Sequence, residues 1–594
     1  MQTLTILAIA AGLIALSAPA TGQPSAAELE PILRDAQGPF LPELDADPKA
    51  LAASPVGQDL LKWVAETDWT IPATTYTDYR RYRATGERPP YERPYFAKRE
   101  LLTRAVLGAW LDGAPDYLDR VNDLVWSICE ETNWVVPAHE GPHRAIDLFC
   151  AETAADLGHV VLLLGDRLPE EVRDRIRAEV DRRVLAPYLE GPNAYGWGDG
   201  HHNWTGVCAG SVGEAFLLLE PDPARQAQAL EHVLAQLDRY IHRAFTEDGA
   251  SLEGVGYWSY GLLHYVILGE MLRSRTDGAI DLLAVPRLQA VATFPLAMAL
   301  DRTTCANFAD AEPSLALPPF LVSRLADRAG APSLRALAGR PFSFRLDNVL
   351  RNLLWWDGGR DAPFAIENTY LAQAAVARRV AQAGDAPVVL VAKAGHNAEP
   401  HNNNDVGSFI LHIDGVTYLC DPGRGLYSRE YFSNKRYDNL FANAYGHSLP
   451  VIGDRAQPAG SDYRGEMTID GDAVVIRFEK AYGLPELREA ERRLTLAADG
   501  TLQFQDRFTF DGPGLPIKET FMTWLDVQTE GSIARIRSDK GDLVLVGDGL
   551  TFATERLEEE CKANAKRGVL TRIYAQLPPA SESVARITMT YEPR

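Results

Sequence analysis

Polar and aromatic side chains that could bind a sugar acid lie together in one glycine-rich segment, residues 200–210. His202 and Asn203 offer imidazole and amide hydrogen-bond donors, and the indole of Trp204 offers an apolar ring face against which a sugar can stack. This pattern favours a polar binding site with an aromatic platform. The structural alternative is a loop that caps a helix, with Asn203 hydrogen-bonded to the backbone.

A second cluster combines a carboxylate, three glycines and aromatic side chains within residues 248–260. Glu253 lies among the glycines, and a helix is expected to begin at about Tyr257, which would place this phenol at the edge of a loop. Tyr260 follows on the same expected helix. Aromatic residues at this spacing can also form the core stripe of a helix, but the flanking glycines and Glu253 favour a site.

The third cluster contains residue types that bind metal ions, and it is spread over segments 401–405, 421–424 and 445–448. His401, Asn403, Asp421 and His447 could together form a metal site. His and Asp suit Zn²⁺, whereas Asn is an uncommon ligand for this ion. The alternative is a hydrogen-bonded group of Asn, His and Asp side chains that fixes the loops.

The charge balance of the chain limits its partners. Its 594 residues include 59 Lys and Arg against 81 Asp and Glu, a formal net charge of −22. This composition does not give the basic footprint of a protein that binds nucleic acid. An anionic substrate remains compatible with a locally basic cleft. Arg80, Arg424 and Arg436 are candidates to line such a cleft, with ordinary solvated charge as the alternative for each.

The hydrophobic period changes along the chain near residue 385. Between residues 25 and about 350, apolar residues recur at helical spacing between loops rich in Gly, Asn and Trp, which indicates an α/α toroid. After Asp385 the period is two, and Asp414-Gly415 and Asp499-Gly500 each separate two apolar runs, which predicts hairpins. The expected fold is α+β and multidomain: an N-terminal α/α toroid with its junction over residues 23–384, and a C-terminal antiparallel β-sandwich over residues 385–594.

An apolar run over residues 4–16, followed by small residues, opens the chain. The run is shorter than the roughly 20 residues that span a membrane, and the small residues suit cleavage by signal peptidase. We therefore expect a signal peptide over residues 1–22, an exported protein that is periplasmic or secreted, and no membrane span. The alternative is an N-terminal core helix or anchor. The six cysteines are scattered without a CxxC pair, so a zinc ribbon is not indicated.

In their order and spacing, the three clusters together resemble those of the heparinase II/III-like polysaccharide lyases, a family that includes alginate oligomer lyases and heparin or heparan sulfate lyases. The resemblance covers most of the mature chain and implies a toroid followed by a β-sandwich. It also implies that His202 or Asn203 neutralises the substrate carboxylate, that Tyr257 serves as base and acid, and that His401 assists in the site.

The same resemblance bears on metal and substrate binding. Family members can hold a structural zinc ion at the positions of Asn403, Asp421 and His447, although many relatives carry His where this chain has Asn403. No organic cofactor is implied. The partner would be an acidic polysaccharide or oligosaccharide, and a homodimer remains open. The residues expected to contact substrate are Trp204, Glu253, Tyr260, Arg424, Arg80 and Arg436.

The implied reaction is β-elimination, which breaks the bond between C4 of a uronate and its glycosidic oxygen and leaves a 4,5-unsaturated uronate end. Neutralising the carboxylate stabilises the charge that develops when the C5 proton is removed. A Tyr with its ordinary pKa of about 10 is a poor base at neutral pH. We therefore expect a nearby cation, His401 or Arg424, to lower the pKa of Tyr257.

Two other functions compete with the lyase. A glycoside hydrolase on a similar toroid would need a pair of carboxylates, and the pairs that could be tried are Glu253 with Asp199 and Glu140 with Glu247. A non-catalytic exported protein could instead bind glycan through tryptophan platforms. The sequence also leaves the uronate glycan open, with alginate, heparan-type glycosaminoglycan, glucuronan and ulvan as choices, and it does not distinguish exo from endo action.

Overall fold

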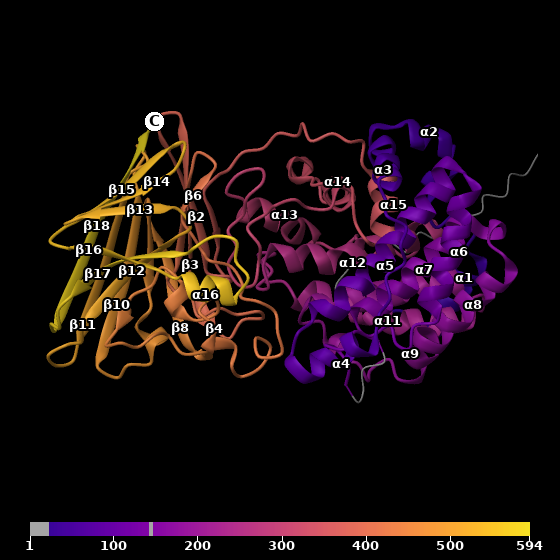
Figure 1. Ribbon diagram of the computed structural model, residues 1–594, viewed down its shortest axis with the longest axis horizontal. Coiled ribbons are helices and arrows are strands. Elements are labelled where there is room, and N and C mark those ends of the chain that lie inside the picture. The colour runs from indigo at the N-terminus through magenta and orange to yellow at the C-terminus, as the bar shows by residue number, and fades with distance from the viewer. Residues whose placement is uncertain (1–22, 142–145) are drawn as a thin grey trace, which may run out of the picture.

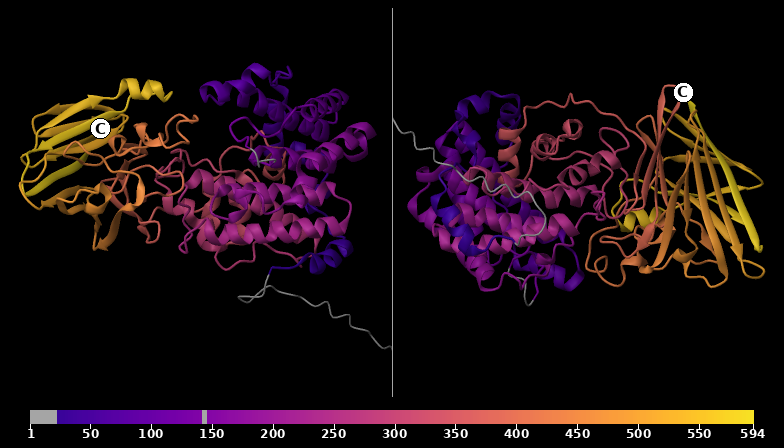
Figure 2. Two further views of the ribbon diagram at one scale, coloured as in Figure 1. Left: turned by 90° about the horizontal axis from the view of Figure 1, so that it is seen from below. Right: turned by 180° about the vertical axis from the view of Figure 1, so that it is seen from behind.

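The computed structural model describes residues 23–141 and 146–594. The expected signal peptide, residues 1–22, lies outside the described residues. A helical half and a sheet half lie side by side along the long axis of the molecule (Figure 1), and two further views separate them in the same way (Figure 2). The expected order, toroid first and sandwich second, is confirmed.

Helices α1 to α15 belong to the first half, and the short helix α16 lies among the strands of the second. Their bounds are α1 Ala26–Asp35, α2 Pro48–Ala53, α3 Pro55–Ala65, α4 Tyr76–Thr85, α5 Pro89–Leu107, α6 Pro115–Cys129, α7 Leu148–Leu164, α8 Glu170–Val180, α9 Ala186–Glu190, α10 Asn203–Leu219, α11 Pro223–Arg243, α12 Val255–Arg275, α13 Leu288–Met298, α14 Pro319–Arg328, α15 Leu346–Trp355 and α16 Glu558–Ala563.

Three helices, α7, α10 and α12, form the centre of the toroid and are buried on nearly all faces. Glycines let α10 and α12 approach closely: a Cβ on Gly206 would lie 2.3 Å from the carbonyl oxygen of Gly261, and one on Gly210 would lie 2.6 Å from the Cβ of His264. Both pairs advance in the same direction along the chain, so the two helices run parallel. Their N-terminal ends, which carry the first two sequence clusters, therefore lie at the same end of the toroid.

The central position of α7 explains its composition. Residues Leu148–Arg167 form the one helical segment within the described ranges that is long and apolar enough to cross a membrane, and 72% of its apolar window is buried inside the structure. A helix that is hydrophobic on all sides is expected at the centre of a large protein. The six cysteines of the two halves are all buried, and their thiols are free.

The strands of the second half form three antiparallel sheets, ordered β1-β2-β3-β5-β6, β13-β14-β15-β18-β11-β10-β9-β8-β4 and β16-β17-β12-β7. Their bounds are β1 Thr369–Leu371, β2 Val376–Ala383, β3 Ala386–Lys393, β4 Gly395–Asn397, β5 Phe409–Ile413, β6 Val416–Leu419, β7 Val451–Ile452, β8 Gly460–Asp470, β9 Ala473–Arg477, β10 Leu487–Leu496, β11 Leu502–Phe510, β12 Ile517–Thr523, β13 Asp526–Glu530, β14 Ile533–Arg537, β15 Gly541–Gly547, β16 Phe552–Arg556, β17 Thr571–Leu577 and β18 Glu582–Pro593.

Both expected hairpins are present, β5 with β6 and β10 with β11. Asp414 and Gly415 have φ of 49° and 80°, as a two-residue turn that follows strand twist requires. The sheets themselves begin earlier than residue 385, because β1 and β2 precede it. Arg378 and Arg379 interrupt the apolar pattern of β2, and the buried Arg378 donates hydrogen bonds to backbone oxygens of the toroid.

Strand β3 is the wall shared by the two halves. Val388 and Leu390 belong to the core of the sandwich, whereas Val389 and Val391 pack into the continuous core of the toroid. Successive side chains of a strand point to opposite faces, so both faces of β3 are covered. This is why its sequence is a continuous apolar run rather than an alternation of apolar and polar residues.

Candidate active site

A tight turn leads into α10 and fixes the first cluster. Gly200 has φ of +90°, and a Cβ there would lie 2.6 Å from the backbone carbonyl carbon of Arg239, so the turn requires glycine. His202 is the N-cap residue of α10 and Asn203 begins the helix. The backbone N–H and the Nδ2 of Asn203 donate to the two carboxylate oxygens of Glu253, at 2.7 and 2.9 Å. A single carboxylate thus joins the starts of α10 and α12.

The hydrogen bond to Glu253 uses one of the two side-chain N–H donors of Asn203 and leaves the other without a partner among the described residues. An Asn amide carries two N–H donors, and one of them is used by Glu253. Within the described ranges, Asn203 Oδ1 and His202 Nδ1 are buried and have no hydrogen-bond partner. At this end of the toroid, a bound carboxylate could therefore accept hydrogen bonds from His202 and from the second amide hydrogen of Asn203. Glu253, expected to contact substrate, is instead held by Asn203.

Helix α12 begins directly after Gly254, whose φ is +93°, and Tyr257 lies in its first turn. Its ring stacks on the imidazole of His401, with 4.1 Å between ring centroids and 21° between planes. Its hydroxyl lies 2.5 Å from the hydroxyl of Tyr427, in the loop after β6. The second and third sequence clusters therefore meet at Tyr257, across the boundary between the toroid and the sheets.

His401 is held in a constrained backbone conformation, with φ of 54°. Its Nδ1 lies 2.9 Å from Asp310 Oδ2, and its Nε2 lies 3.7 Å from Glu253 Oε1. The imidazole thus bridges two carboxylates while its face contacts Tyr257. A non-glycine residue with positive φ is uncommon, and here it directs the ring toward the toroid.

Asp310 is the centre of this site, and the sequence analysis did not single it out. Its Oδ1 accepts hydrogen bonds from Tyr431 and Arg436, each at 2.7 Å, and its Oδ2 accepts from Tyr427 at 3.2 Å and contacts His401. Burial acts to raise the pKa of Asp310, but the hydrogen bond from His401 and the charge of Arg436 outweigh it and lower the pKa. Asp310 is therefore a buried carboxylate linked directly to Tyr427 and, through it, to Tyr257.

The pKa of Tyr257 shifts in the direction opposite to the one expected from the sequence. Burial is the largest influence and raises the pKa; the hydrogen bond with Tyr427 lowers it, and Asp310 and Glu253 raise it further. The charge of Arg424 has only a small lowering effect. Burial raises the pKa of Tyr427 as well. Both phenols are therefore neutral in the free protein, joined by a short hydrogen bond.

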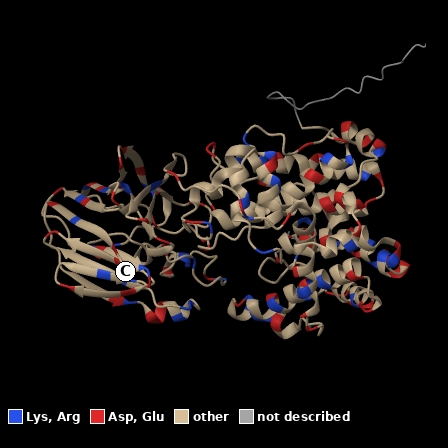
Figure 3. Cartoon of the chain, turned by 90° about the horizontal axis from the view of Figure 1, so that it is seen from above, with Lys and Arg blue, Asp and Glu red and all other residues tan. Residues whose placement is uncertain are grey.

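The three arginines expected in a binding cleft have different environments. Arg436 is mostly buried and binds Asp310 and the backbone oxygens of Asn402 and His401, so it holds the site together. Arg424 pairs with Glu312 at 3.0 Å and covers the ring of Tyr427 at 4.2 Å. Arg80 lies exposed on α4. Acidic and basic residues are interspersed over both halves of the molecule rather than gathered on one face (Figure 3).

The two remaining expected contacts, Trp204 and Tyr260, have different neighbours. Trp204 is partly buried and packs against the ring of His139, with centroids 4.8 Å apart. Tyr260 is one helical turn along from Tyr257, and the guanidinium of Arg345 lies 4.6 Å from the centroid of its ring. Trp204 therefore belongs to the α10 side of the site, and Tyr260 belongs to a neighbouring pocket.

The possible metal ligands converge in a different combination from the expected one. Asp405, Asp421 and His447 are buried, and one potential ligand atom from each lies within 4.8 Å of the others. Within the described ranges, Asp405 Oδ2 and His447 Nε2 lack hydrogen-bond partners, and His447 Nδ1 and Asp421 Oδ2 face each other at 3.2 Å. Asn403 does not join them, because its amide donates to the backbone oxygen of Ala309 at 2.9 Å. The residues present fit a divalent cation, with Asp405 in the third place.

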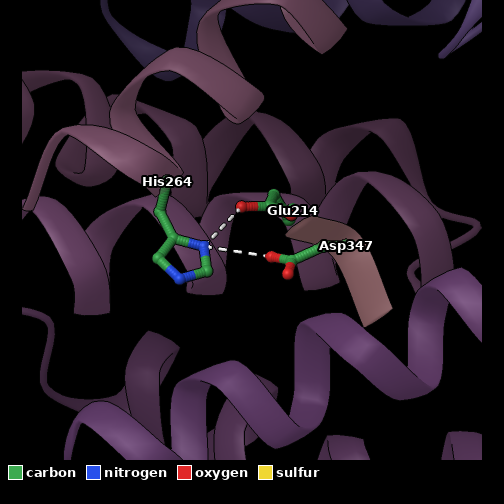
Figure 4. A group of neighbouring side chains, drawn as sticks. All are labelled: Glu214, His264 and Asp347. Carbon is green, nitrogen blue, oxygen red and sulfur yellow. Dashed lines mark hydrogen bonds and ion pairs between the residues drawn. The ribbon is translucent and has the colours of Figure 1, made fainter. Parts of the chain in front are cut away.

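A second ionic cluster lies deep in the toroid, on α10, α12 and α15. His264 Nδ1 faces both Glu214 and Asp347, at 3.0 and 3.3 Å (Figure 4), and its Nε2 lies 3.4 Å from Glu152. Burial acts to lower the pKa of His264, but Asp347, Glu152 and Glu214 raise it to about 10. The imidazole is therefore positively charged at neutral pH, which offsets the charge of the surrounding carboxylates.

The carboxylate pairs that a hydrolase would use are engaged in other contacts. Glu253 is bonded to Asn203, and Glu140 accepts hydrogen bonds from Tyr79 and Asn133, at 2.6 and 3.0 Å. Asp199 accepts from the backbone of His201. Glu247 accepts from the side chain of Gln373 at 3.3 Å.

Comparison with known proteins gives a likeness of structure but not of sequence. No protein-family model and no curated protein matches the chain. The crystal structure of heparinase III superposes with a TM-score of 0.66 and 12% identity, covering 96% of this chain and 89% of that chain. Heparan sulfate lyase HepC from Pedobacter heparinus gives 0.58 and 13%, covering 96% and 88%. The chain therefore has the fold of the heparinase-like polysaccharide lyases, an α/α toroid followed by an antiparallel β-sandwich.

Proposed function

We propose that the protein is a polysaccharide lyase that cleaves a uronic-acid-containing glycan by β-elimination and leaves a 4,5-unsaturated uronate end. The observation that carries this proposal is the chain of contacts Tyr257–Tyr427–Asp310, which runs from the mouth of the toroid to a buried carboxylate. Hydroxyl groups joined in this way to a carboxylate can move a proton between a substrate at Tyr257 and Asp310.

The raised pKa values of the two tyrosines favour a relay over a phenolate base. As Tyr257 takes the C5 proton, it passes its own proton to Tyr427, which passes one to Asp310. Negative charge then moves from Asp310 to the substrate, where His202 and the free amide hydrogen of Asn203 stabilise the enolate-like carboxylate. When the C4–O bond breaks and the C4=C5 bond forms, the proton returns through the same hydroxyls to the leaving oxygen.

The test of this function is ultraviolet absorbance, because the new double bond is conjugated with the carboxylate. Wild type and Tyr257→Phe are incubated with alginate, glucuronan, ulvan and heparan-type chains and their oligomers. A rise with one substrate that is lost in the variant supports elimination through Tyr257. New reducing ends without a rise in absorbance would identify a hydrolase and overturn the proposal.

We also propose a structural zinc ion at Asp405, Asp421 and His447. When bound, the ion would tie the loop after β6 to the loop before β5 and so stabilise the segments that carry His401 and Tyr427; no step of the reaction passes through it. Metal analysis of the purified protein tests this. The expected result is close to one zinc per chain in wild type and a large loss in Asp421→Asn, and equal zinc in the two would contradict it.

Export remains part of the proposed function, since a polysaccharide substrate is met outside the cytoplasm. The first described helix, α1, begins at Ala26, shortly after the proposed cleavage region. Sequencing the N-terminus of the mature protein from its native host tests the proposal. A first residue near position 21 or 23 supports a cleaved signal peptide, and an intact Met1 contradicts it.

A further inference from the structure

A pocket of about 400 Å³ lies beside the candidate active site, on the neighbouring face of α12. Gly256 and Tyr260 form one wall. Arg340, Phe342 and Arg345 from the segment that leads into α15, and Asn348 from its first turn, form another. At roughly 100° per residue, Gly256 and Tyr260 lie close together on the same side of Tyr257 around the helix. The volume is within the roughly 300–1,000 Å³ of small-molecule sites.

The pocket offers a cation, Arg340, that has no partner within residues 23–141 and 146–594. The side chain of Arg340 is exposed and has no hydrogen bond or ion pair with any residue that the structure describes. Arg345 differs, because its Nε already donates to Glu152 at 2.6 Å. A guanidinium presents a planar fork of donors that matches a carboxylate. Arg340 is therefore placed to receive an acidic group.

Two further features of the pocket suit a sugar. Asn348 is only 3% exposed, and its Oδ1 has no hydrogen-bond partner among the described residues. A buried acceptor without a donor is costly, and a sugar hydroxyl would supply the donor. Phe342 is 38% exposed at the same pocket, and its ring offers an apolar face to the C–H groups of a sugar. A free cation, a buried acceptor and an aromatic face together match an acidic sugar residue.

We propose that this pocket binds, through the carboxylate on Arg340, a second uronate residue of the same glycan chain whose reacting uronate lies at Tyr257. The inference rests on the proposed function, because it names the substrate as an oligomer with acidic residues beyond the one that reacts. The first turns of α12 and the segment from Asp310 to Pro318 contribute residues to both sites, which therefore lie next to each other.

Direct binding tests the pocket independently of catalysis. Tyr257→Phe, which binds without turnover, is titrated calorimetrically with tetrasaccharides of alginate, of heparan sulfate and of its unsulfated precursor polymer, and with neutral cellotetraose. The same titrations use the double variants Tyr257→Phe/Arg340→Gln and, as a matched control, Tyr257→Phe/Arg167→Gln, since Arg167 is an exposed arginine of the toroid away from the pocket.

The proposal predicts that an unsulfated acidic tetrasaccharide binds, that Arg340→Gln weakens this binding at least about tenfold, as the loss of a charge-assisted pair should, and that Arg167→Gln leaves it unchanged. Equal affinity in the two double variants, or no binding of any acidic tetrasaccharide, overturns it. A loss confined to the sulfated probe overturns the carboxylate assignment. The absorbance assay with wild type decides the proposed reaction separately, so either proposal can fail alone.

Discussion

The molecule contains two networks built from the same residue types, one around Asp310 and one around His264. Each joins histidine, carboxylate and arginine by contacts of about hydrogen-bond length. The histidine and carboxylates of the His264 network lie on helices α7, α10, α12 and α15 and are almost wholly buried, and Arg345 adjoins them just before α15. The Asp310 network lies on loops, and its histidine keeps 21% of its side chain exposed. Access and the attached tyrosine pair, rather than the kinds of ionisable group, distinguish the proposed reactive site from the buried network.

The largest effect on turnover is expected when one hydroxyl is removed next to the Asp310 network. Tyr257→Phe should lower turnover by about 10²–10⁴-fold, the usual contribution of a positioned proton-transfer group, while the melting temperature changes little. Turnover is followed by ultraviolet absorbance and stability by calorimetry. Tyr76→Phe is the control, because Tyr76 is 75% exposed on α4. Activity retained in Tyr257→Phe would exclude this tyrosine from the reaction.

The corresponding change in the buried network should act on stability instead. His264→Gln removes the charge that the three carboxylates face, and breaking a buried ionic group in this way costs about 3–5 kcal/mol of unfolding free energy. Denaturant unfolding measures the loss. Turnover per folded molecule should be unchanged, and a selective loss of turnover in a fully folded variant would contradict a purely structural role.

A smaller effect on turnover is expected when Asp310, the centre of its network, is replaced. Asp310→Asn keeps the size of the side chain and removes the proton acceptor, so turnover should fall about 10²-fold. The relay also predicts that wild-type turnover declines as pH falls toward the lowered pKa of Asp310, and that Asp310→Asn removes this acid limb. An unchanged acid limb in a pH profile of the variant would show that another group accepts the proton.

The smallest expected effect is the pH dependence of stability that the His264 network contributes. The pKa of His264 is raised from 6.5 to about 10 in the folded protein, so its contribution to stability is complete below about pH 6.5 and is lost as pH rises toward 10. The slope should be at most about 1.4 kcal/mol per pH unit. Calorimetry of wild type and His264→Gln from pH 6 to 10 should show a steeper decline in wild type, and parallel curves would refute the charged imidazole.

Local chemistry explains which parts of the structure were predictable from sequence. The two hairpins follow from Asp-Gly turns, whereas the grouping of His202, Asn203, Tyr257 and His401 was expected from the family resemblance. Asp310 is one of the 81 acidic residues of the chain and lies in a loop without glycine, so no local sequence pattern distinguishes it. The pKa of Tyr257 was expected to fall because sequence reveals nearby cations but not burial, and burial dominates.

The shared wall β3 has a consequence for how the chain can be divided. A gene cut at residue 385 would release a toroid lacking Val389 and Val391, and a sandwich with those valines and Ile410 facing water. Uncovered strand faces of this kind promote aggregation. The two halves should therefore unfold as one cooperative unit, and neither should be obtained as a stable, separately expressed fragment.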